Sequence, residues 1–391
     1  MSRYPFETIE IDGFRGLRNF KMSRLGGVNV LVGGNNCGKT SVLEAISVLC
    51  RPTEPQVWMD VIRWRDPGGM DESRLDSLRW CFQKNSISSN QEGFSVGHCT
   101  FSAKGERGIM RLDVNFQEFE GEPSPYELEK FNRFSNAYEA EQIGKLWRGA
   151  ELVHSLDGSQ VFDGPQMYFP GVERLFIFRF WEDLPIRRFN QSKVEAVAKM
   201  ECSILSAYSY KENLEQVKSL SLFKLTHDGD DATQVVELLQ QFDPDVTAVD
   251  IRSTRGLRPA IYLSHRRLGQ VPLSIFGDAM RRSVLLASTL SPLKPGSVLL
   301  IDEAEAGVHV GAQARFFAWL IKVAKQKQVQ VFMTTHSLEA LDALLSGLPD
   351  DAADDDLVVY QLHRHGEELD CKRFAGDLLH RLRFERGLDL R

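Results

Sequence analysis

The stretch Gly33-Gly34-Asn35-Asn36-Cys37-Gly38-Lys39-Thr40 decides the fold of this chain, because it fits the phosphate-loop pattern G-x-x-x-x-G-K-[ST] at every fixed position. Residues 27–32 (GVNVLV) predict a short buried strand before it, and residues 41–49 (SVLEAISVL) predict the helix that follows. Glycines let such a loop wrap a phosphate closely, and the amides at the helix start point at the anion. The sequence therefore predicts a nucleotide-binding protein.

Each polar side chain of the predicted loop has an expected task. Lys39 is expected to reach the β- and γ-phosphates, and the Thr40 hydroxyl is expected to ligate Mg²⁺. Cys37 occupies a position where many residues are tolerated, so it predicts no redox role. The predicted nucleotide-contacting residues of this segment are Gly33, Asn35, Asn36, Cys37, Gly38, Lys39, Thr40 and Ser41.

Length and composition place the chain among globular proteins. Its 391 residues can hold two or three domain-sized units, and 42% hydrophobic with 26% charged residues argues against disorder. No apolar run approaches membrane-spanning length, and six cysteines without a CxxC pair favour a reduced, cytoplasmic compartment. The net charge of −7 means that any contact with DNA must come from a local basic patch.

A second nucleotide motif, SVLLIDE, occupies residues 297–303. Four apolar residues predict a buried central strand, and the acids Asp302 and Glu303 follow at its carboxyl end, where ligands bind in open α/β sheets. Asp302 is placed to hold Mg²⁺, directly or through water. Glu303 is placed to orient and activate the attacking water.

A third predicted strand, residues 329–333, ends in Thr334-Thr335-His336-Ser337. A single histidine at a strand end is more often structural than catalytic. Here His336 lies 33 residues after Glu303, with one predicted helix (312–325) between them. That strand-helix-strand spacing brings His336 to the sheet edge that holds Asp302, where it is expected to contact the γ-phosphate.

Outside these motifs the sequence indicates two further units. Polar and apolar residues alternate over 94–101 and 108–116 around a glycine-containing turn, which predicts a hairpin in an antiparallel β-layer beside the phosphate loop. Between 121 and 245 the pattern loosens, and we expect an inserted, mainly helical subdomain. Its predicted elements are helices at 127–147, 192–218 and 232–241, and a strand-like segment at 166–180.

The motifs GGNNCGKTS, VLLIDEAEAGVH and TTHS together resemble the ABC-type ATPases of the RecF/SMC and OLD group. Within that group the chain is most similar to prokaryotic "AAA family" ATPases of anti-phage defence loci, over residues 6–118 and 243–345. The opening IEIDGFRGL and the stretch LSIFGDAMRRSVLLAS also match. The first of these places Arg15 among the expected nucleotide contacts.

The resemblance implies a composite site. In such ATPases two subunits sandwich two ATP molecules, and a signature segment from one subunit completes the site of the other. Here that segment is Gly277-Asp278-Ala279-Met280-Arg281, at the start of a helix predicted to run to residue 290. Gly277 stands where the family has serine, unless Ser274 takes that role, and Ala279 replaces the second glycine. Gly277, Asp278 and Arg281 are the expected trans contacts.

Two charged segments have alternative explanations. Residues 251–270 predict paired strands that carry five arginines and no acid: Arg252, Arg255, Arg258, Arg266 and Arg267. They form either a phosphate-binding face for DNA or an exposed hairpin balanced by neighbouring acids. Asp354 and Asp356 form a DxD pair like that of the TOPRIM nuclease domain in OLD-type relatives. Only 35 residues follow it, so we expect a closing strand and terminal helix there.

The sequence thus predicts an α/β P-loop ATPase head with a two-layer core, an antiparallel β-layer and a helical insertion. The expected division is 1–120 and 246–391 for the head and 121–245 for the insertion. The favoured function is a Mg²⁺-dependent ATPase that forms a homodimer or larger assembly and controls a separately encoded effector in anti-phage defence. A RecF-like DNA-repair ATPase is the alternative. An ABC transporter subunit is disfavoured, because LSGGQ is absent and 263 residues separate Lys39 from Asp302.

Overall fold

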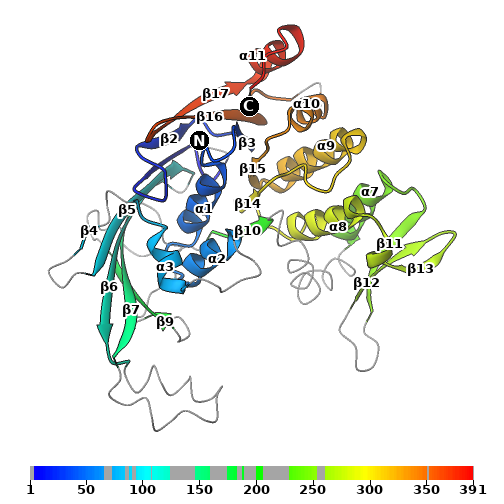
Figure 1. Ribbon diagram of the computed structural model, residues 1–391. Helices are drawn as coiled ribbons and strands as arrows, with labels where there is room; N and C mark the ends of the chain where they lie inside the picture. Colours follow the sequence, from blue (N-terminus) through cyan, green and yellow to red (C-terminus); the bar gives the residue numbers. More distant parts are fainter. Residues whose placement is uncertain are drawn as a thin grey trace.

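A computed structural model describes residues 4–65, 73–83, 88–89, 94–106, 108–123, 146–158, 174–182, 187–188, 200–205, 229–252, 260–349 and 352–390. Within these residues the strands form a mixed core sheet, a long antiparallel sheet and a small third sheet (Figure 1). None of the helices in the described part of the chain has the length and apolar character needed to cross a membrane.

The core sheet has the strand order β10-β14-β15-β3-β16-β17. All neighbouring pairs are parallel except β16 and β17, which form an antiparallel hairpin. Its strands are β10 (Cys202–Leu205), β14 (Val298–Ile301), β15 (Gln330–Thr334), β3 (Val28–Gly33), β16 (Leu357–His365) and β17 (Glu368–Ala375). Since β3, β14 and β15 run in parallel side by side, their carboxyl ends lie at one edge of the sheet.

Both faces of the core sheet are covered, which is why its central strands are continuous apolar runs. In β14, Val298 and Leu300 face one hydrophobic cluster, whereas Leu299 and Ile301 face another. The first cluster contains α1 (Lys39–Cys50), α2 (Gln56–Arg65), α3 (Arg74–Arg79) and the antiparallel sheet. The second contains α8 (Asp278–Leu290), α9 (Val310–Lys327) and α10 (Leu338–Ser346) (Figure 1).

The antiparallel sheet covers α1 on the side away from the core sheet (Figure 1). Its strands are β1 (Thr8–Asp12), β2 (Phe20–Ser23), β4 (Ser88–Ser89), β5 (Ser95–Gly105), β6 (Gly108–Gly121), β7 (Trp147–Gly158), β8 (Arg174–Trp181) and β9 (Arg187–Arg188). Gly105 pairs with Gly108, so β5 and β6 form the expected hairpin, and that prediction is confirmed. The inward residues Phe101 and Leu112 are fully buried against the helices.

The expected helical character of residues 121–245 is wrong for most of the described part of this segment. β7, which was not expected, and β8, which matches the strand-like segment expected at 166–180, extend the antiparallel sheet, because inward residues such as Leu152 and Phe178 continue its buried face. β10 pairs with β14 at the edge of the core sheet, where a helix was expected. The helix expected at 232–241 is present as α7 (Gly229–Gln240). Most of the helices expected at 127–147 and 192–218 lie outside the described residues.

A buried hydrogen-bond chain fixes β7 to the segment around α2. Trp58 Nε1 donates to His154 Nε2 over 2.9 Å, and His154 Nδ1 lies 2.7 Å from the carbonyl oxygen of Pro52. Because a carbonyl oxygen only accepts, the ring carries its proton on Nδ1 and is neutral. Burial lowers the pKa of His154 to about 4. His154 therefore joins β7 to this segment through two buried hydrogen bonds.

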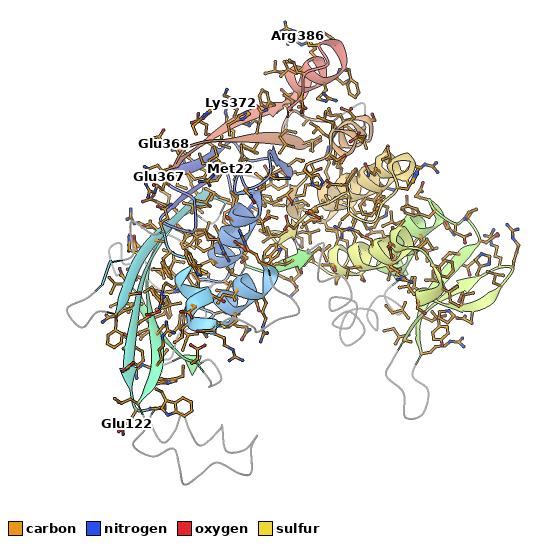
Figure 2. All side chains as sticks on the ribbon, viewed as in Figure 1. Met22, Glu122, Glu367, Glu368, Lys372 and Arg386 are labelled. Carbon is orange, nitrogen blue, oxygen red and sulfur yellow. The ribbon has the colours of Figure 1, made fainter. Side chains whose placement is uncertain are left out.

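The remaining elements lie at the ends of the molecule. The third sheet pairs β11 (Val246–Arg252) with β12 (Ala260–His265) and β12 with β13 (Gly269–Pro272), as expected for residues 251–270. After β17 the chain forms α11 (Gly376–His380) and a π-helical turn (Arg381–Glu385). The labelled residues Glu122, near the end of β6, and Arg386, after that turn, mark opposite extremes of the structure (Figure 2).

Candidate nucleotide site

The phosphate loop joins β3 to α1 through backbone conformations that favour glycine. Gly33 has a φ of 146° and Gly38 a φ of 104°, and Asn36 between them also adopts a left-handed conformation with φ 60°. A Cβ on Gly33 would lie 2.5 Å from the carbonyl oxygen of Leu362 on β16, so a larger residue would force the loop away from the sheet. The glycines therefore keep the loop close to the strand ends.

Lys39 opens α1 and folds its side chain back over the loop. Its Nζ donates to the carbonyl oxygens of Gly33 (2.7 Å) and Gly34 (3.0 Å). The helix has no acidic residue in its first turn, and its N-cap residue, Gly38, has no side chain to cap the first amides. A cation and uncapped amides at one point favour an anion such as a phosphate. Asn35 and Asn36 are exposed at the same loop, whereas Cys37 is a buried free thiol.

The sheet order brings the acids of the second motif to the phosphate loop. Thr40 Oγ1 lies 3.2 and 3.3 Å from the two carboxylate oxygens of Asp302, although 262 residues separate them in sequence. Thr334 Oγ1, at the end of β15, donates to Asp302 Oδ1 over 2.5 Å. A hydroxyl and a carboxylate are oxygen ligands of the kind that Mg²⁺ prefers. This donor set fits the ion expected from the sequence.

Glu303 follows Asp302 in a left-handed conformation with φ 49°, which is uncommon for a residue other than glycine. Its amide donates to Thr334 Oγ1 over 2.9 Å. Burial, and then the charge of Asp302, raise the pKa of Glu303. A carboxylate at a sheet edge with a raised pKa is suited to accept a proton.

His336 lies beside Glu303, as expected from the strand-helix-strand spacing. Its half-exposed ring partly opposes the effect of burial and of Asp302 on the pKa of Glu303, which is raised overall. His336 Nδ1 lies 3.5 Å from Glu305 Oε1, and its amide donates to the same oxygen over 3.3 Å. Glu305 is nearly buried, so one carboxylate fixes both the backbone and the ring of His336. Glu305 was not predicted as a site residue, although DEAE places a third acid after the strand.

A second charged cluster lies around Glu44 on α1, and it was not predicted from the sequence either. Glu44 is fully buried and pairs with Arg15 Nε (2.6 Å) and Arg65 Nε (2.8 Å). Arg65 Nη2 also donates to Ser41 Oγ over 2.8 Å. The nucleotide contacts expected of Arg15 and Ser41 stay predictions. An acid within the apolar run SVLEAISVL was the signal in the sequence.

The signature residues begin α8 and have local partners. Gly277 precedes the helix in an extended conformation, and the Arg281 guanidinium contacts the carbonyl oxygen of Ser274 and the Asp278 carboxylate. Ile275, just before them, is 72% exposed. The next residue, Arg282, is instead buried, and its Nη2 donates to the carbonyl oxygen of Glu303 over 2.8 Å. No feature of the sequence distinguishes the environments of these two arginines.

The arginine-rich segment 251–270 has one acidic partner among its described contacts. Arg267 Nε lies 2.5 Å from Asp245 Oδ2, and Arg252 stacks over the Tyr262 ring at 5.7 Å. Arg266 donates its amide to the Asp245 carbonyl oxygen. Arg255 and Arg258 lie outside the described residues. Among the described arginines, the ion pair of Arg267 with Asp245 agrees with the explanation of an exposed hairpin that has neighbouring acids.

One group of side chains in the described residues has metal-ligand spacing: Asp243, Asp245 and His265. His265 Nδ1 accepts from the amides of Arg267 (3.1 Å) and Leu268 (3.2 Å), so its proton resides on Nε2. Nε2 in turn lies 3.2 Å from Asp243 Oδ2. Both ring nitrogens are thus occupied, and the cluster ties β11 to the turn before β13.

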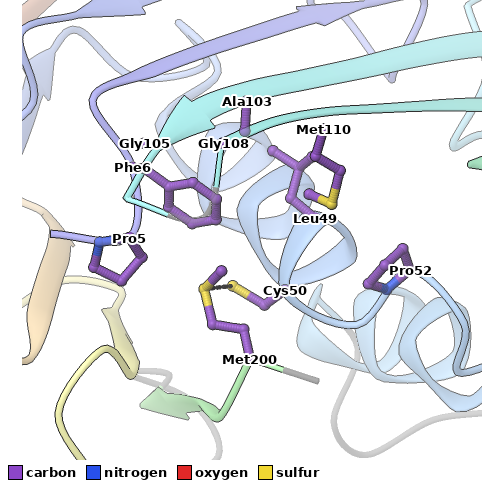
Figure 3. Close-up of a pocket in the computed structure, with 10 residues that line it drawn as sticks. All are labelled: Pro5, Phe6, Leu49, Cys50, Pro52, Ala103, Gly105, Gly108, Met110 and Met200. Carbon is purple, nitrogen blue, oxygen red and sulfur yellow. Dashed lines mark hydrogen bonds between the residues drawn. The ribbon is translucent and has the colours of Figure 1, made fainter. Parts of the chain in front are cut away.

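The apolar cavity in Figure 3 lies at the other end of α1 from Lys39. It measures about 30 Å³ and is lined by Phe6, Leu49, Cys50, Met110, Met200 and neighbouring residues. Cys50 Sγ and Met200 Sδ are 3.8 Å apart across it. A space of this size holds about one water molecule, so it is a gap in packing between the sheets.

Family models match both halves of the chain. Residues 6–142 match a model described as "AAA ATPase domain", and residues 167–342 match one described as "AAA domain, putative AbiEii toxin, Type IV TA system". The chain is 35% identical over 115 residues to the protein MJECL11 of Methanocaldococcus jannaschii, and this match covers 29% of the chain and 98% of MJECL11.

Two further comparisons concern part of a relative and the fold. The chain is 29% identical over 109 residues to an "ATP/GTP phosphatase" of Helicobacter pylori, which is 27% of this chain and 28% of that protein. An SMC head bound to the C-terminal winged-helix domain of ScpA superposes with a TM-score of 0.50 at 13% identity, over 96% of this chain and 98% of that one. The expected ABC-type α/β fold is confirmed. The chain belongs to the same family as MJECL11.

Proposed function

We propose that this chain binds ATP with Mg²⁺ and hydrolyses it in a site shared by two copies of the chain. One observation carries the proposal. The phosphate loop, the Asp302–Glu303 pair and His336 come from three adjacent parallel strands and meet at one sheet edge. That edge is where open α/β sheets bind ligands.

The residues divide the work by their chemistry. Lys39 and the first amides of α1 bind the phosphates, and Thr40 and Asp302 hold Mg²⁺. Bound there, Mg²⁺ supplies positive charge to the phosphate oxygens. Glu303, with its raised pKa, accepts the proton of the attacking water. His336 contacts the terminal phosphate.

The signature segment supports a site shared between subunits. Among the described residues, no atom lies within 4 Å of the position that a Cβ on Gly277 would take, and Ile275 beside it is exposed. The start of α8 is therefore open to a second molecule. Its amides suit the γ-phosphate bound by a partner.

We further propose that the chain controls a separately encoded effector and has no nuclease chemistry in its DxD pair. Asp356 is buried, and its carboxylate accepts from Lys325 Nζ (2.6 Å) and from the Ala353 amide (2.9 Å). These bonds give Asp356 a structural role before β16. The toxin-type description of the matched family model supports a role in defence but names no partner of this chain.

The test of the chemistry compares Glu303→Gln with Lys39→Ala. Without its base, Glu303→Gln is expected to bind ATP normally and hydrolyse it about 10²–10⁴-fold more slowly. Lys39→Ala is expected to lose ATP binding. Binding is measured with a fluorescent ATP analogue and hydrolysis by phosphate release.

Glu237→Gln is the matched control, because Glu237 pairs with Lys322 on the surface. It should behave as wild type. Near-normal turnover by Glu303→Gln would remove Glu303 from the proposed mechanism.

A further inference from the structure

Two consecutive arginines at the start of α8 differ in burial and in their contacts. Neighbouring residues of a helix point about 100° apart, which follows from 3.6 residues per turn. The Arg281 side chain is 27% exposed and contacts Ser274 and Asp278 at the helix start. Arg282 is 8% exposed and points into the protein, toward the end of β14.

Arg282 holds the backbone of the catalytic strand end. Its Nη2 donates to the carbonyl oxygen of Glu303 over 2.8 Å and approaches that of Asp302 at 3.4 Å. With Thr334 accepting from the Glu303 amide, the uncommon backbone conformation of Glu303 is held from both sides. Burying a guanidinium costs free energy unless its N–H groups are hydrogen-bonded. Because Arg282 makes such a bond to the Glu303 carbonyl oxygen, it restricts the position of the Glu303 backbone.

The loop after Glu303 packs on the same helix turn. Gly307 has a φ of 74°, and a Cβ there would lie 3.5 Å from Asp278 Cβ and 3.8 Å from Arg282 Cδ. The start of α8 is therefore in contact with the catalytic loop on its buried side. The same helix turn carries the signature residues Gly277, Asp278 and Arg281, which the proposed function gives to the partner subunit.

We propose that Arg282 is a positioning residue that places Glu303 of its own subunit and makes that placement depend on the position of the signature helix. This inference rests on the proposed function. A partner that docks on the exposed side of α8 thereby acts on the base of the subunit that carries the helix. Arg281 contacts the nucleotide that the partner subunit binds, whereas Arg282 positions Glu303 at the nucleotide of its own subunit.

The two arginines can be separated by mixing subunits. A Lys39→Ala subunit supplies an intact signature but cannot bind ATP. Paired with Arg281→Gln, it leaves one complete site, made of the Arg281→Gln subunit's own Lys39 and Glu303 and the partner's signature. In a dimer of Lys39→Ala with Arg282→Met, only the Arg282→Met subunit binds ATP. The Glu303 of that subunit lacks its contact with Arg282.

We expect Arg282→Met alone to lower kcat about 10–100-fold, with the Kd for a fluorescent ATP analogue within about threefold of wild type. Arg282→Lys, which keeps one donor and the charge, should recover part of kcat. Excess Lys39→Ala should restore activity to Arg281→Gln but not to Arg282→Met.

Each other outcome has a distinct meaning. Equal restoration of both variants would show that Arg282 acts on the partner, and would overturn the inference while keeping the shared site. No restoration of Arg281→Gln would overturn the shared site itself, and the inference with it. Loss of ATP binding in both Arg282→Met and Arg282→Lys would assign Arg282 to folding alone and also overturn the inference.

Discussion

Glu305 links the loop after β14 to the histidine of the next strand. Its Oε1 accepts from the His336 amide and lies 3.5 Å from the ring Nδ1, while Oε2 is buried. A carboxylate on one ring nitrogen fixes the tautomer and leaves the other nitrogen to face a substrate. In the proposed mechanism that substrate atom belongs to the terminal phosphate.

We predict that Glu305→Gln lowers kcat about 10–100-fold and changes the KM for ATP less than threefold, because the amide lacks the charge that orients the His336 ring. Steady-state phosphate release at several ATP concentrations measures both. Glu339→Gln is the control, since Glu339 lies on nearby α10 and contacts Ser337. An unchanged kcat in Glu305→Gln would show that His336 needs no orienting group.

Residues that belong to a contiguous motif could be predicted from the sequence, and those that act through distant partners could not. Lys39 and Asp302 stand out because their neighbours in the chain define them. Glu44, Arg282 and Glu305 gain meaning only from Arg15, Glu303 and His336, which lie in other segments. Such pairings depend on the order of strands in the sheet.

Among the elements, β7 shows how a buried polar residue can join a strand to a neighbouring segment by hydrogen bonds. His154 lies on its inward face between Trp58 and the Pro52 carbonyl oxygen. The strand was not predicted, because its alternation is interrupted by histidine, serine and aspartate in LVHSLDG. The hairpin of β5 and β6 was predicted, because its alternation is regular and its turn contains glycine at both ends.

We predict that protonation of His154 destabilises the fold in acid. Its folded pKa of about 4 lies below the ordinary 6.5, so the unfolded chain binds the proton more readily. The stability present above pH 6.5 should fall by up to about 3 kcal/mol as the pH drops to 4. Denaturant unfolding at several pH values measures this loss.

The control for this prediction removes the titrating group. His154→Gln should be less stable at pH 7 and should lose that share of the pH dependence. His98→Gln should keep it, because His98 is half-exposed on β5. An identical pH profile in His154→Gln and wild type would show that His154 does not titrate in this range.

For the whole molecule, the proposed shared site makes activity depend on association. We predict that ATP hydrolysis per subunit rises with protein concentration in the dilute range, because only paired chains complete a site. Glu303→Gln with ATP should sediment as a dimer or larger species, whereas Lys39→Ala should sediment as a monomer. Constant activity per subunit down to protein that sediments as a monomer would refute the shared site.

The position of β3 in the core sheet has a consequence for synthesis. Val28 pairs with Val331 on one side and with Leu357 on the other, so both partners of β3 come from the last quarter of the chain. At about 5–20 residues per second, roughly 15–60 s separate translation of β3 from that of β15. The apolar strand must stay unpaired on the ribosome for that time. A nascent chain therefore presents an aggregation-prone segment early and gains a nucleotide site only after β15 and β16 have been translated.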